Sequence, residues 1–319
     1  LMRLLPYYLI GIIVLSLVPI TGNEYIVHVM ILVYIYMILA SSLDILVGYT
    51  GALNLGHAAF FAIGAYTSTL LSMKFGVSPW IGLILGGLFA MIAGLILGIP
   101  CLRLRGPYLA ISTLGFGIVV YMFLNNLEEI TRGPLGIPGI PPLPGLGILD
   151  FTKKTTYYYF AMILGLTCLL ILKLLAMSRY GKILIAIRED EDAAKVMGIN
   201  VTKFKIIAFI TSACFAGLLG ASAWALKTPY VFPPEVFEIH YTVEAIIIVL
   251  LGGAGTLLGP IVGGLVYGLS KYYLSVIVPG FQLLIFAPIV IIIIILFPEG
   301  IIGMIKKRTK GRWVERFII

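Results

Sequence analysis

The stretch Gly48-Tyr-Thr-Gly-Ala-Leu-Asn-Leu-Gly-His-Ala-Ala-Phe-Phe-Ala-Ile-Gly-Ala-Tyr66 decides how this chain folds. It is apolar enough to enter a bilayer, yet glycines and polar residues interrupt it: Gly48, Gly51, Gly56, Gly64, Asn54 and His57. Such a backbone is tolerated at membrane depth only where other helices bury it or where it lines a cavity. Polar side chains inside a span are costly and usually face the protein interior. The stretch therefore predicts a pathway through a helical membrane protein.

The composition excludes a soluble protein. Hydrophobic residues make up 61% of the 319 residues and charged residues 11%, whereas soluble domains carry roughly 25% charged residues. Long unbroken apolar runs favour helices over a barrel, whose strands would show alternating segments of about ten residues. Cys101, Cys168 and Cys214 are scattered in apolar sequence. They predict neither a disulfide framework nor a metal site.

The apolar runs predict an all-α polytopic membrane protein with about ten transmembrane or broken helices, forming one membrane domain over residues 1–319. A membrane helix needs roughly 20 apolar residues. The runs fall near 4–20, 26–46, 51–73, 79–101, 108–124, 156–177, 204–226, 241–258, 259–278 and 281–298. The first run lacks a small-residue cleavage site, so we expect a membrane helix there rather than a signal peptide.

The basic residues predict the orientation. With a cytoplasmic N-terminus, sixteen of the 22 Lys and Arg residues fall on the inner side and six on the outer side. This excess predicts that the N- and C-termini are both cytoplasmic. It places the segment 178–205 and the basic tail 304–319 inside, and the Pro- and Gly-rich segment 125–155 outside as an extended loop. The net charge of +8 then reflects membrane orientation and contact with anionic lipid rather than nucleic acid.

A second glycine-rich segment echoes the first. Gly252-Gly-Ala-Gly255 follows Glu244 by eight positions, as Gly48-Tyr-Thr-Gly51 follows Asp44 by four. Corresponding glycine-interrupted segments in two halves of a transporter point to its pathway, although tight helix packing also explains such glycines. The candidate pathway residues are Gly48, Gly51, Asn54, Gly56, His57, Glu244, Gly252, Gly253 and Gly255. The sequence leaves open whether Glu244 meets a substrate ammonium, couples to a proton or caps a helix at the interface.

The inward segment 178–205 carries the second candidate site. It looks helical, and within it lies Asp192-Ala-Ala-Lys-Val-Met-Gly198. The alanines would give a thin face, and Gly198 would end the helix. An ordinary solvated loop helix is the alternative. No Gly-x-x-x-x-Gly-Lys-Ser/Thr, Cys/His cluster or serine elbow occurs, so we expect no ATP site, cofactor, metal or enzymatic activity in this chain.

Five segments together resemble the permease subunits of branched-chain amino-acid ABC importers, of the LivM type: Gly48–Tyr66, Leu104–Phe116, Arg188–Gly198, Glu244–Pro260 and Phe297–Ile301. The resemblance implies a second related permease subunit, two ATP-binding cassette ATPases and an external substrate-binding protein, in the plasma membrane of a prokaryote. It also implies a cytoplasmic Glu-Ala-Ala-xxx-Gly element that docks in a groove of the ATPase. Here Asp192 replaces the usual Glu, and no Leu-Pro follows.

The function implied by this resemblance is ATP-driven import of leucine, isoleucine and valine by alternating access. The residues implied in ATPase coupling are Arg188, Glu189, Glu191, Asp192, Ala193, Ala194 and Gly198. Urea and short-amide permeases share the motifs, so they are one alternative. An ion-coupled secondary transporter is another, in which Asp44, His57 or Glu244 would carry the ion. A membrane enzyme is disfavoured because no catalytic constellation appears.

Overall fold

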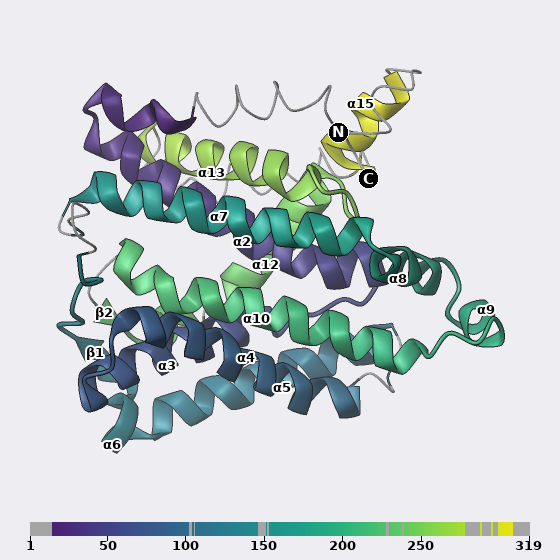
Figure 1. The fold of residues 1–319 in the computed structure, drawn as a ribbon, viewed down its shortest axis with the longest axis horizontal. Helices are drawn as coiled ribbons and strands as arrows, with labels where there is room; N and C mark the ends of the chain where they lie inside the picture. The colour runs from purple at the N-terminus through teal and green to yellow at the C-terminus, as the bar shows by residue number, and fades with distance from the viewer. Residues whose placement is uncertain are drawn as a thin grey trace.

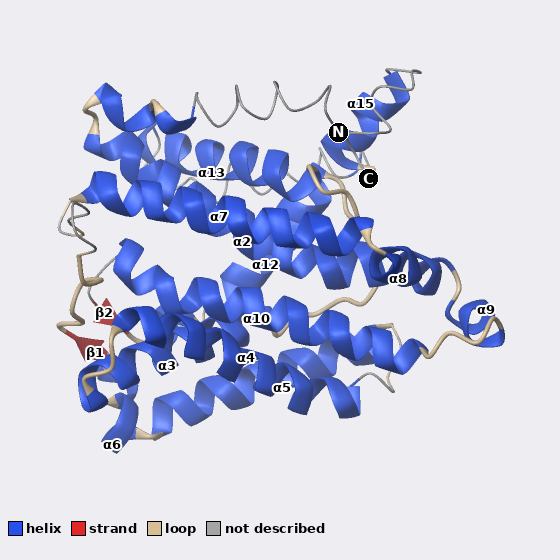
Figure 2. Ribbon diagram, viewed as in Figure 1, coloured by secondary structure: helices blue, strands red, loops and turns tan. Residues whose placement is uncertain are grey.

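The computed structural model describes residues 15–101, 104, 106–145, 151, 153–227, 230–237, 239–277, 288, 295 and 299–308. Over these residues the chain is a bundle of long helices that run roughly along one axis (Figure 1). The long helices are α2 (Glu24–Thr50), α3 (His57–Phe75), α4 (Pro79–Cys101), α5 (Pro107–Asn126), α7 (Lys154–Met177), α10 (Val201–Lys227), α12 (Ile239–Gly252) and α13 (Gly259–Ile277). Figure 2 shows how little of the described chain is strand or loop.

The two ends of the bundle carry different short elements (Figure 1). At one end β1 (Ile137–Pro138) pairs antiparallel with β2 (Tyr230–Val231). The other short elements around the long helices are η1 (Val18–Thr21), α6 (Glu128–Thr131), η2 (Gly133–Leu135), α11 (Pro233–Val236) and α15 (Gly300–Arg308). At the opposite end α8 (Arg179–Glu189) and α9 (Glu191–Val196) project beyond the long helices.

Helix α2 forms the centre of the bundle. It is apolar on all sides, which is typical of a helix surrounded by others. In its most apolar stretch of 18 residues, 89% of the residues are buried. It contacts α7, α10, α12 and α13. By contrast, only 28% of the residues are buried in the most apolar 18-residue stretches of α5 and α7. The exposed faces of these outer helices are themselves apolar, as expected of surfaces that face lipid.

The helical membrane fold predicted from the sequence is confirmed in its coarse form. Among the described residues, five helices are long and apolar enough to cross a membrane: α2, α4, α5, α7 and α10. Most of the predicted runs 4–20 and 281–298 lies outside the described residues. The predicted run 51–73 was wrong at its start, since residues 51–56 are not helical, and the predicted run 241–258 was wrong at its end, since α12 stops at Gly252.

Glycines in left-handed conformations explain both corrections. Gly51 has φ = +68° and ends α2, while Gly253 and Gly255, with φ of +121° and +72°, follow the end of α12. Glycine adopts this region at no steric cost and therefore terminates helices. The predicted outer loop 125–155 is extended in part, but it also contains α6 and the short pairing of β1 with β2.

Small residues bring α3, α4 and α10 into backbone contact. A Cβ added at Gly64 of α3 would collide with the backbone of Gly217 in α10, and one added at Gly220 would collide with the carbonyl of Phe61. Membrane helices rely on such close approach because lipid offers no hydrophobic driving force between them. The α3–α10 interface therefore holds the segment 51–56 in place at the start of α3.

Gly220→Ala should lower the stability of the protein by about 1–3 kcal/mol, because the added methyl overpacks the interface. Gly115→Ala in α5 is the matched control, since a Cβ at Gly115 meets nothing within 4 Å. The control should leave stability unchanged or raise it by up to about 1 kcal/mol. Thermal unfolding of both variants in detergent measures the difference, and equal midpoints would contradict the packing argument.

Candidate functional site

The non-helical segment 51–56 re-enters the bundle. His57, the first residue of α3, is fully buried and contacts Ser42 of α2, with 2.9 Å between His57 Nε2 and Ser42 Oγ. Ser42 lies eight residues, about 12 Å, before the end of α2 at Thr50. Helix α3 therefore starts well inside the bundle, which is typical of the broken helices that form transporter sites.

Side chains satisfy the backbone of this segment. The donor–acceptor pairs are Leu55 N to Thr113 Oγ1 of α5 (3.0 Å), Gly56 N to Asn54 Oδ1 (2.9 Å) and Ala58 N to Thr242 Oγ1 of α12 (2.9 Å). Backbone groups inside a membrane must find such partners within the protein. We call Ser42, Asn54, His57, Thr113 and Thr242 the polar cluster. Its members come from α2, α3, α5, α12 and the segment before α3.

Two nitrogens of the polar cluster have no partner. Asn54 and His57 are both 0% exposed. Asn54 Nδ2 and His57 Nδ1 make no hydrogen bond to any residue that the structure describes. Buried polar groups in native proteins are nearly always hydrogen-bonded, so these two nitrogens, like seven other buried side-chain atoms of the described residues, would gain from a bound partner.

The two glycine-rich segments of the sequence meet in space. Asp44 Oδ1 accepts a hydrogen bond from Gly255 N (2.9 Å), and Arg188 Nη1 donates to the carbonyl of Gly48 (2.6 Å). A Cβ at Gly48 would collide with the Asp44 carboxylate and the Gly255 backbone. We call Asp44, Gly48, Arg188 and Gly255 the glycine junction. It joins the C-terminal end of α2, the loop after α12, and α8.

The other predicted glycines are close-packed. A Cβ at Gly51 would press on the Arg188 side chain, and one at Gly56 would collide with the Thr113 carbonyl. Gly252 packs on the Gly259 carbonyl of α13. Gly253 meets Gly300 of α15, a contact that sequence reasoning missed although Gly300 lies in the quoted segment 297–301.

Glu244 has an internal partner. Lys271 Nζ of α13 lies 2.6 Å from Glu244 Oε1 and donates to the Tyr36 hydroxyl at 2.9 Å. The ammonium also lies 5.1 Å from the centre of the Tyr36 ring and 5.9 Å from that of Tyr267. The sequence placed Lys271 on the outer side, but its charge is used between α12 and α13. A lysine inside an apolar run was the signal for this ion pair.

The predicted short helix of the inward segment is present as α9. Asp190 Oδ1 caps its start by accepting hydrogen bonds from Asp192 N and Ala193 N at 2.9 and 3.0 Å. Gly198, with φ = +81°, follows its end, as predicted. The bonds Gly198 N to Lys195 O and Ile199 N to Ala194 O close a Schellman motif. Both ends of this helix are therefore fixed by local chemistry.

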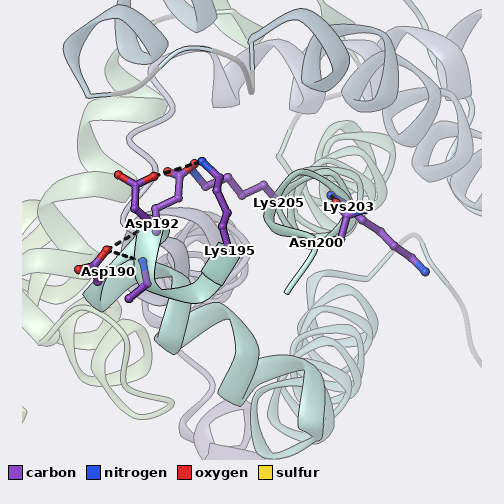
Figure 3. A network of polar contacts seen from close by, with 8 residues as sticks. Asp190, Asp192, Lys195, Asn200, Lys203 and Lys205 are labelled. Carbon is purple, nitrogen blue, oxygen red and sulfur yellow. Dashed lines mark hydrogen bonds and ion pairs between the residues drawn. The ribbon is translucent and has the colours of Figure 1, made fainter. Parts of the chain in front are cut away.

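Ion pairs fasten α9 to α10 (Figure 3). Glu191 binds Lys205 of α10 at 2.5 Å and Lys195 at 3.1 Å, and Lys205 is itself buried. Burial raises the pKa of Glu191, but its bonds to Lys205 and Lys195 outweigh this and lower the pKa below the ordinary value. Lys203 points away from this network in Figure 3. Helix α9 is therefore held in a defined position relative to α10.

The faces of α9 differ from the expected alanine face. Ala193 is exposed, but Ala194 is turned inward against Ile187 and Val201. Val196 and Met197 are 88% and 81% exposed at the tip of the segment. Sequence reasoning missed these two residues, although two apolar side chains within a charged segment were the available signal. Glu189 and Asp192 are also exposed.

A cavity of about 570 Å³ lies between the α8–α9 segment, residues 50–53 and the start of α5. Charged residues line one side of it: Arg188, Glu189, Asp190, Glu191 and Lys205. Apolar residues of α5 line the other side, including Leu109 and Ala110. In the part of the chain that the structure describes, no three His, Cys, Asp or Glu side chains gather as a metal site. The cavity therefore offers both charged and apolar contacts to a solute.

Comparison with known proteins places the chain in a family. Residues 25–296 match the family described as branched-chain amino acid transport system / permease component. The chain is 35% identical over 299 residues to the high-affinity branched-chain amino acid transport system permease protein LivM of Salmonella typhimurium, covering 86% of this chain and 69% of the relative. It is 33% identical over 327 residues to LivM of Escherichia coli, covering 95% and 76%.

A second type of permease is related more distantly. The permease protein LivH of Salmonella typhimurium is 24% identical over 294 residues, covering 84% of this chain and 91% of the relative. No solved structure matched the chain. The family match and the two LivM relatives show that the chain belongs to the branched-chain amino acid permease family. Together with the apolar helices, they identify it as a multi-pass membrane protein.

Proposed function

We propose that this member of the permease family is the membrane subunit of an ATP-driven importer that moves leucine, isoleucine and valine by alternating access. The names of its LivM relatives support the substrate class, and the related LivH proteins support pairing with a second permease. The proposal includes two ATPases that bind the ATP, an external binding protein and the plasma membrane of a prokaryote. The chain itself would hold no cofactor and form a single permease domain.

One observation carries the proposal: the Arg188 guanidinium binds the Gly48 carbonyl at 2.6 Å. Arg188 belongs to α8, next to the exposed α9, whereas Gly48 belongs to the central helix α2. The same junction brings Gly255 and Asp44 together at 2.9 Å. Movement of α8 would therefore act on both glycine segments at once, which is how work done outside the membrane would reach the pathway.

The pathway in this proposal runs between the polar cluster and the inner cavity. The cluster lies at the start of α3. Residues 51–53, which lead to the cluster, line the cavity of about 570 Å³. Asp44 and Glu244 each have a partner, in Gly255 N and Lys271. This leaves less support for either as the carrier of a coupling ion in a secondary transporter.

The ATPase contact in this proposal is the tip of α9. Val196 and Met197 are the most exposed apolar residues there, and an apolar anchor surrounded by charges is typical of a protein interface. Glu189, Asp192 and Ala193 share the exposed surface. Arg188, Glu191, Ala194 and Gly198 would act from behind it, by holding α8 and α9 in position.

We also propose ten crossings with both termini in the cytoplasm, from the sixteen-to-six distribution of basic residues. A single cysteine at position 308, at the end of α15, tests this orientation. In inverted vesicles an impermeant thiol reagent should label it, and in intact cells the same reagent should not. Labelling from outside intact cells would contradict the topology.

The function predicts ATP-dependent uptake by the complex of this chain with its second permease and ATPases in proteoliposomes. When substrate-loaded binding protein is present, the proteoliposomes should accumulate leucine, isoleucine and valine only if ATP is supplied. Uptake of urea but of none of the three amino acids would support the urea-permease alternative. Uptake that needs an ion gradient and no ATP would support a secondary transporter.

In the same assay Arg188→Gln should reduce ATP-driven uptake at least tenfold, because the guanidinium bond to the Gly48 carbonyl is lost. Arg179→Gln is the matched control, since Arg179 is exposed on the same helix. The Arg188 variant should still bind the ATPases and hydrolyse ATP, but without stimulation by loaded binding protein. Equal uptake by both variants would remove Arg188 from the coupling route.

Val196→Glu combined with Met197→Glu should release the ATPases from the permease, because two exposed apolar anchors that the ATPase would cover become charged. Lys203→Glu, an exposed site that points away from the α9 network, is the control for added negative charge. Co-purification of the ATPases measures the effect, and the thermal midpoint of the permease checks its fold. Full ATPase recovery with the double variant would make α9 an ordinary solvated helix.

A further inference from the structure

The Asn54 side chain presents an unused hydrogen-bond donor. Gly56 N–H donates to one end of the amide, so that end must be the oxygen. The other end is therefore the NH₂ group, and Asn54 Nδ2 has no partner among the described residues. The whole side chain is buried. A donor with two free hydrogens thus lies beside the start of α3.

The His57 side chain presents an unused acceptor. Ser42 Oγ has one hydrogen, and it donates to the Leu39 carbonyl at 2.8 Å. With that hydrogen used, we assign the imidazole proton to Nε2 at the 2.9 Å contact between Ser42 Oγ and His57 Nε2. A neutral imidazole with a protonated Nε2 has a bare lone pair at Nδ1. That atom is buried and has no partner in the described part of the chain.

Leaving both atoms unpaired costs stability. A buried polar group without a hydrogen bond costs about 1–3 kcal/mol. Here one such donor and one such acceptor stand three residues apart on a segment that other helices hold rigidly through Thr113 and Thr242. A bound molecule that supplies an acceptor and a donor together would remove both costs.

The chemistry of an α-amino acid fits this pair. Its carboxylate accepts hydrogen bonds, its ammonium donates them, and one carbon separates the two groups. Four members of the polar cluster are Ser, Thr or Asn and carry no charge, and His57 carries none in the neutral tautomer described above. Such a cluster suits a ligand with no net charge. The start of α3 also favours a carboxylate, because a helix N-terminus carries partial positive charge.

The surroundings fit a branched apolar side chain. Phe60, one turn into α3, packs against Phe116 of α5 and Phe209 of α10, with ring centres 5.9 and 6.1 Å apart. Phe60 itself follows His57 by three residues in α3, and the two ring centres are 6.2 Å apart. A zwitterion held at the polar cluster would therefore place its side chain in an aromatic environment.

We infer that Asn54 and His57 bind the two ends of a zwitterionic amino acid during transport, with Asn54 Nδ2 donating to the carboxylate and His57 Nδ1 accepting from the ammonium. This inference rests on the proposed function, because both side chains are fully buried. A solute reaches them only when the helices around α3 separate, as alternating access requires.

Two substitutions of His57 separate binding from packing. In Asn the side-chain amide reaches the position of Nδ1, so His57→Asn keeps an acceptor there and loses the bond to Ser42. In Gln the amide reaches the position of Nε2, so His57→Gln keeps the Ser42 bond and loses the acceptor. Asn54→Ser adds a third test, since a serine hydroxyl can still accept from Gly56 N–H but offers no NH₂ group.

The experiment is ATP-driven leucine uptake at subsaturating concentration by the reconstituted complex. His57→Gln and Asn54→Ser should each lose about tenfold or more, the loss expected for one hydrogen bond to a charged group. His57→Asn should retain more uptake than His57→Gln. If His57→Gln equals or exceeds His57→Asn, or if Asn54→Ser matches the unmodified protein, the inference is overturned while the proposed function stands.

A measurement on the unmodified complex without binding protein does not depend on the variants. Leucine should raise the thermal midpoint of the complex at a concentration about tenfold below that needed for either of two analogues. The analogues are 3-methylbutylamine, which lacks the carboxylate, and 4-methylpentanoate, which lacks the ammonium. Equal concentrations, or no shift with leucine, would overturn binding at both ends. Failure of the proposed function is distinct: the unmodified complex would show no ATP-dependent uptake of any of the three amino acids.

Discussion

The need to satisfy every backbone N–H and C=O inside the protein governs this structure. In lipid an unpaired peptide group costs several kcal/mol, so nearly the whole described chain is helical. The segment 51–56 is the instructive exception. It gives up helical hydrogen bonds at membrane depth, and side chains replace them: Asn54 from the segment itself, Thr113 of α5 and Thr242 of α12. The polar cluster thus exists because the broken helix requires it.

The glycine junction depends on close contact between two backbones. Gly48 and Gly255 touch backbone to backbone, so neither position has room for a Cβ. That contact leaves the Gly48 carbonyl open to Arg188 and the Gly255 N–H open to Asp44. An arginine from α8 thereby reaches a backbone oxygen of the central helix. The absence of side chains at the junction is what allows a charged group from outside the bundle to bind there.

Hydropathy predicted most of the fold because lipid selects on apolar length, and a helix of known rise needs about 20 such residues. It failed where the backbone turns without a change in polarity, as at Gly51 and Gly253. It also missed the ion pair of Lys271, because counting basic residues assumes that each lies in a loop, and this one pairs with Glu244 between α12 and α13. Sequence periodicity alone cannot detect a partner on another helix.

The candidate site residues stay a prediction, and only their positions come from the structure. The similarity of the two glycine segments pointed to a shared pathway but not to their direct contact. The role of Arg188 in joining them could not be predicted either, since its partner is a carbonyl 140 positions away. Which alanine of α9 faces outward depends on where α8 and α10 lie. For that reason Ala194 was misjudged, and Val196 and Met197 were missed.

One helix links the two regions that the proposed mechanism connects. At its inner end, Lys205 of α10 binds Glu191 of α9. Seven residues further along, about 10.5 Å at helical rise, Ser212 Oγ donates to the Ser42 carbonyl of α2 at 2.7 Å. Ser42 in turn holds the ring of His57. In the proposed mechanism, a rigid helix that is fixed by an ion pair at one point and by a hydrogen bond at the other would transmit displacement of α9 to the polar cluster. The glycine junction provides a second connection through α8, so that the start of α3 and the inner end of α2 would move together.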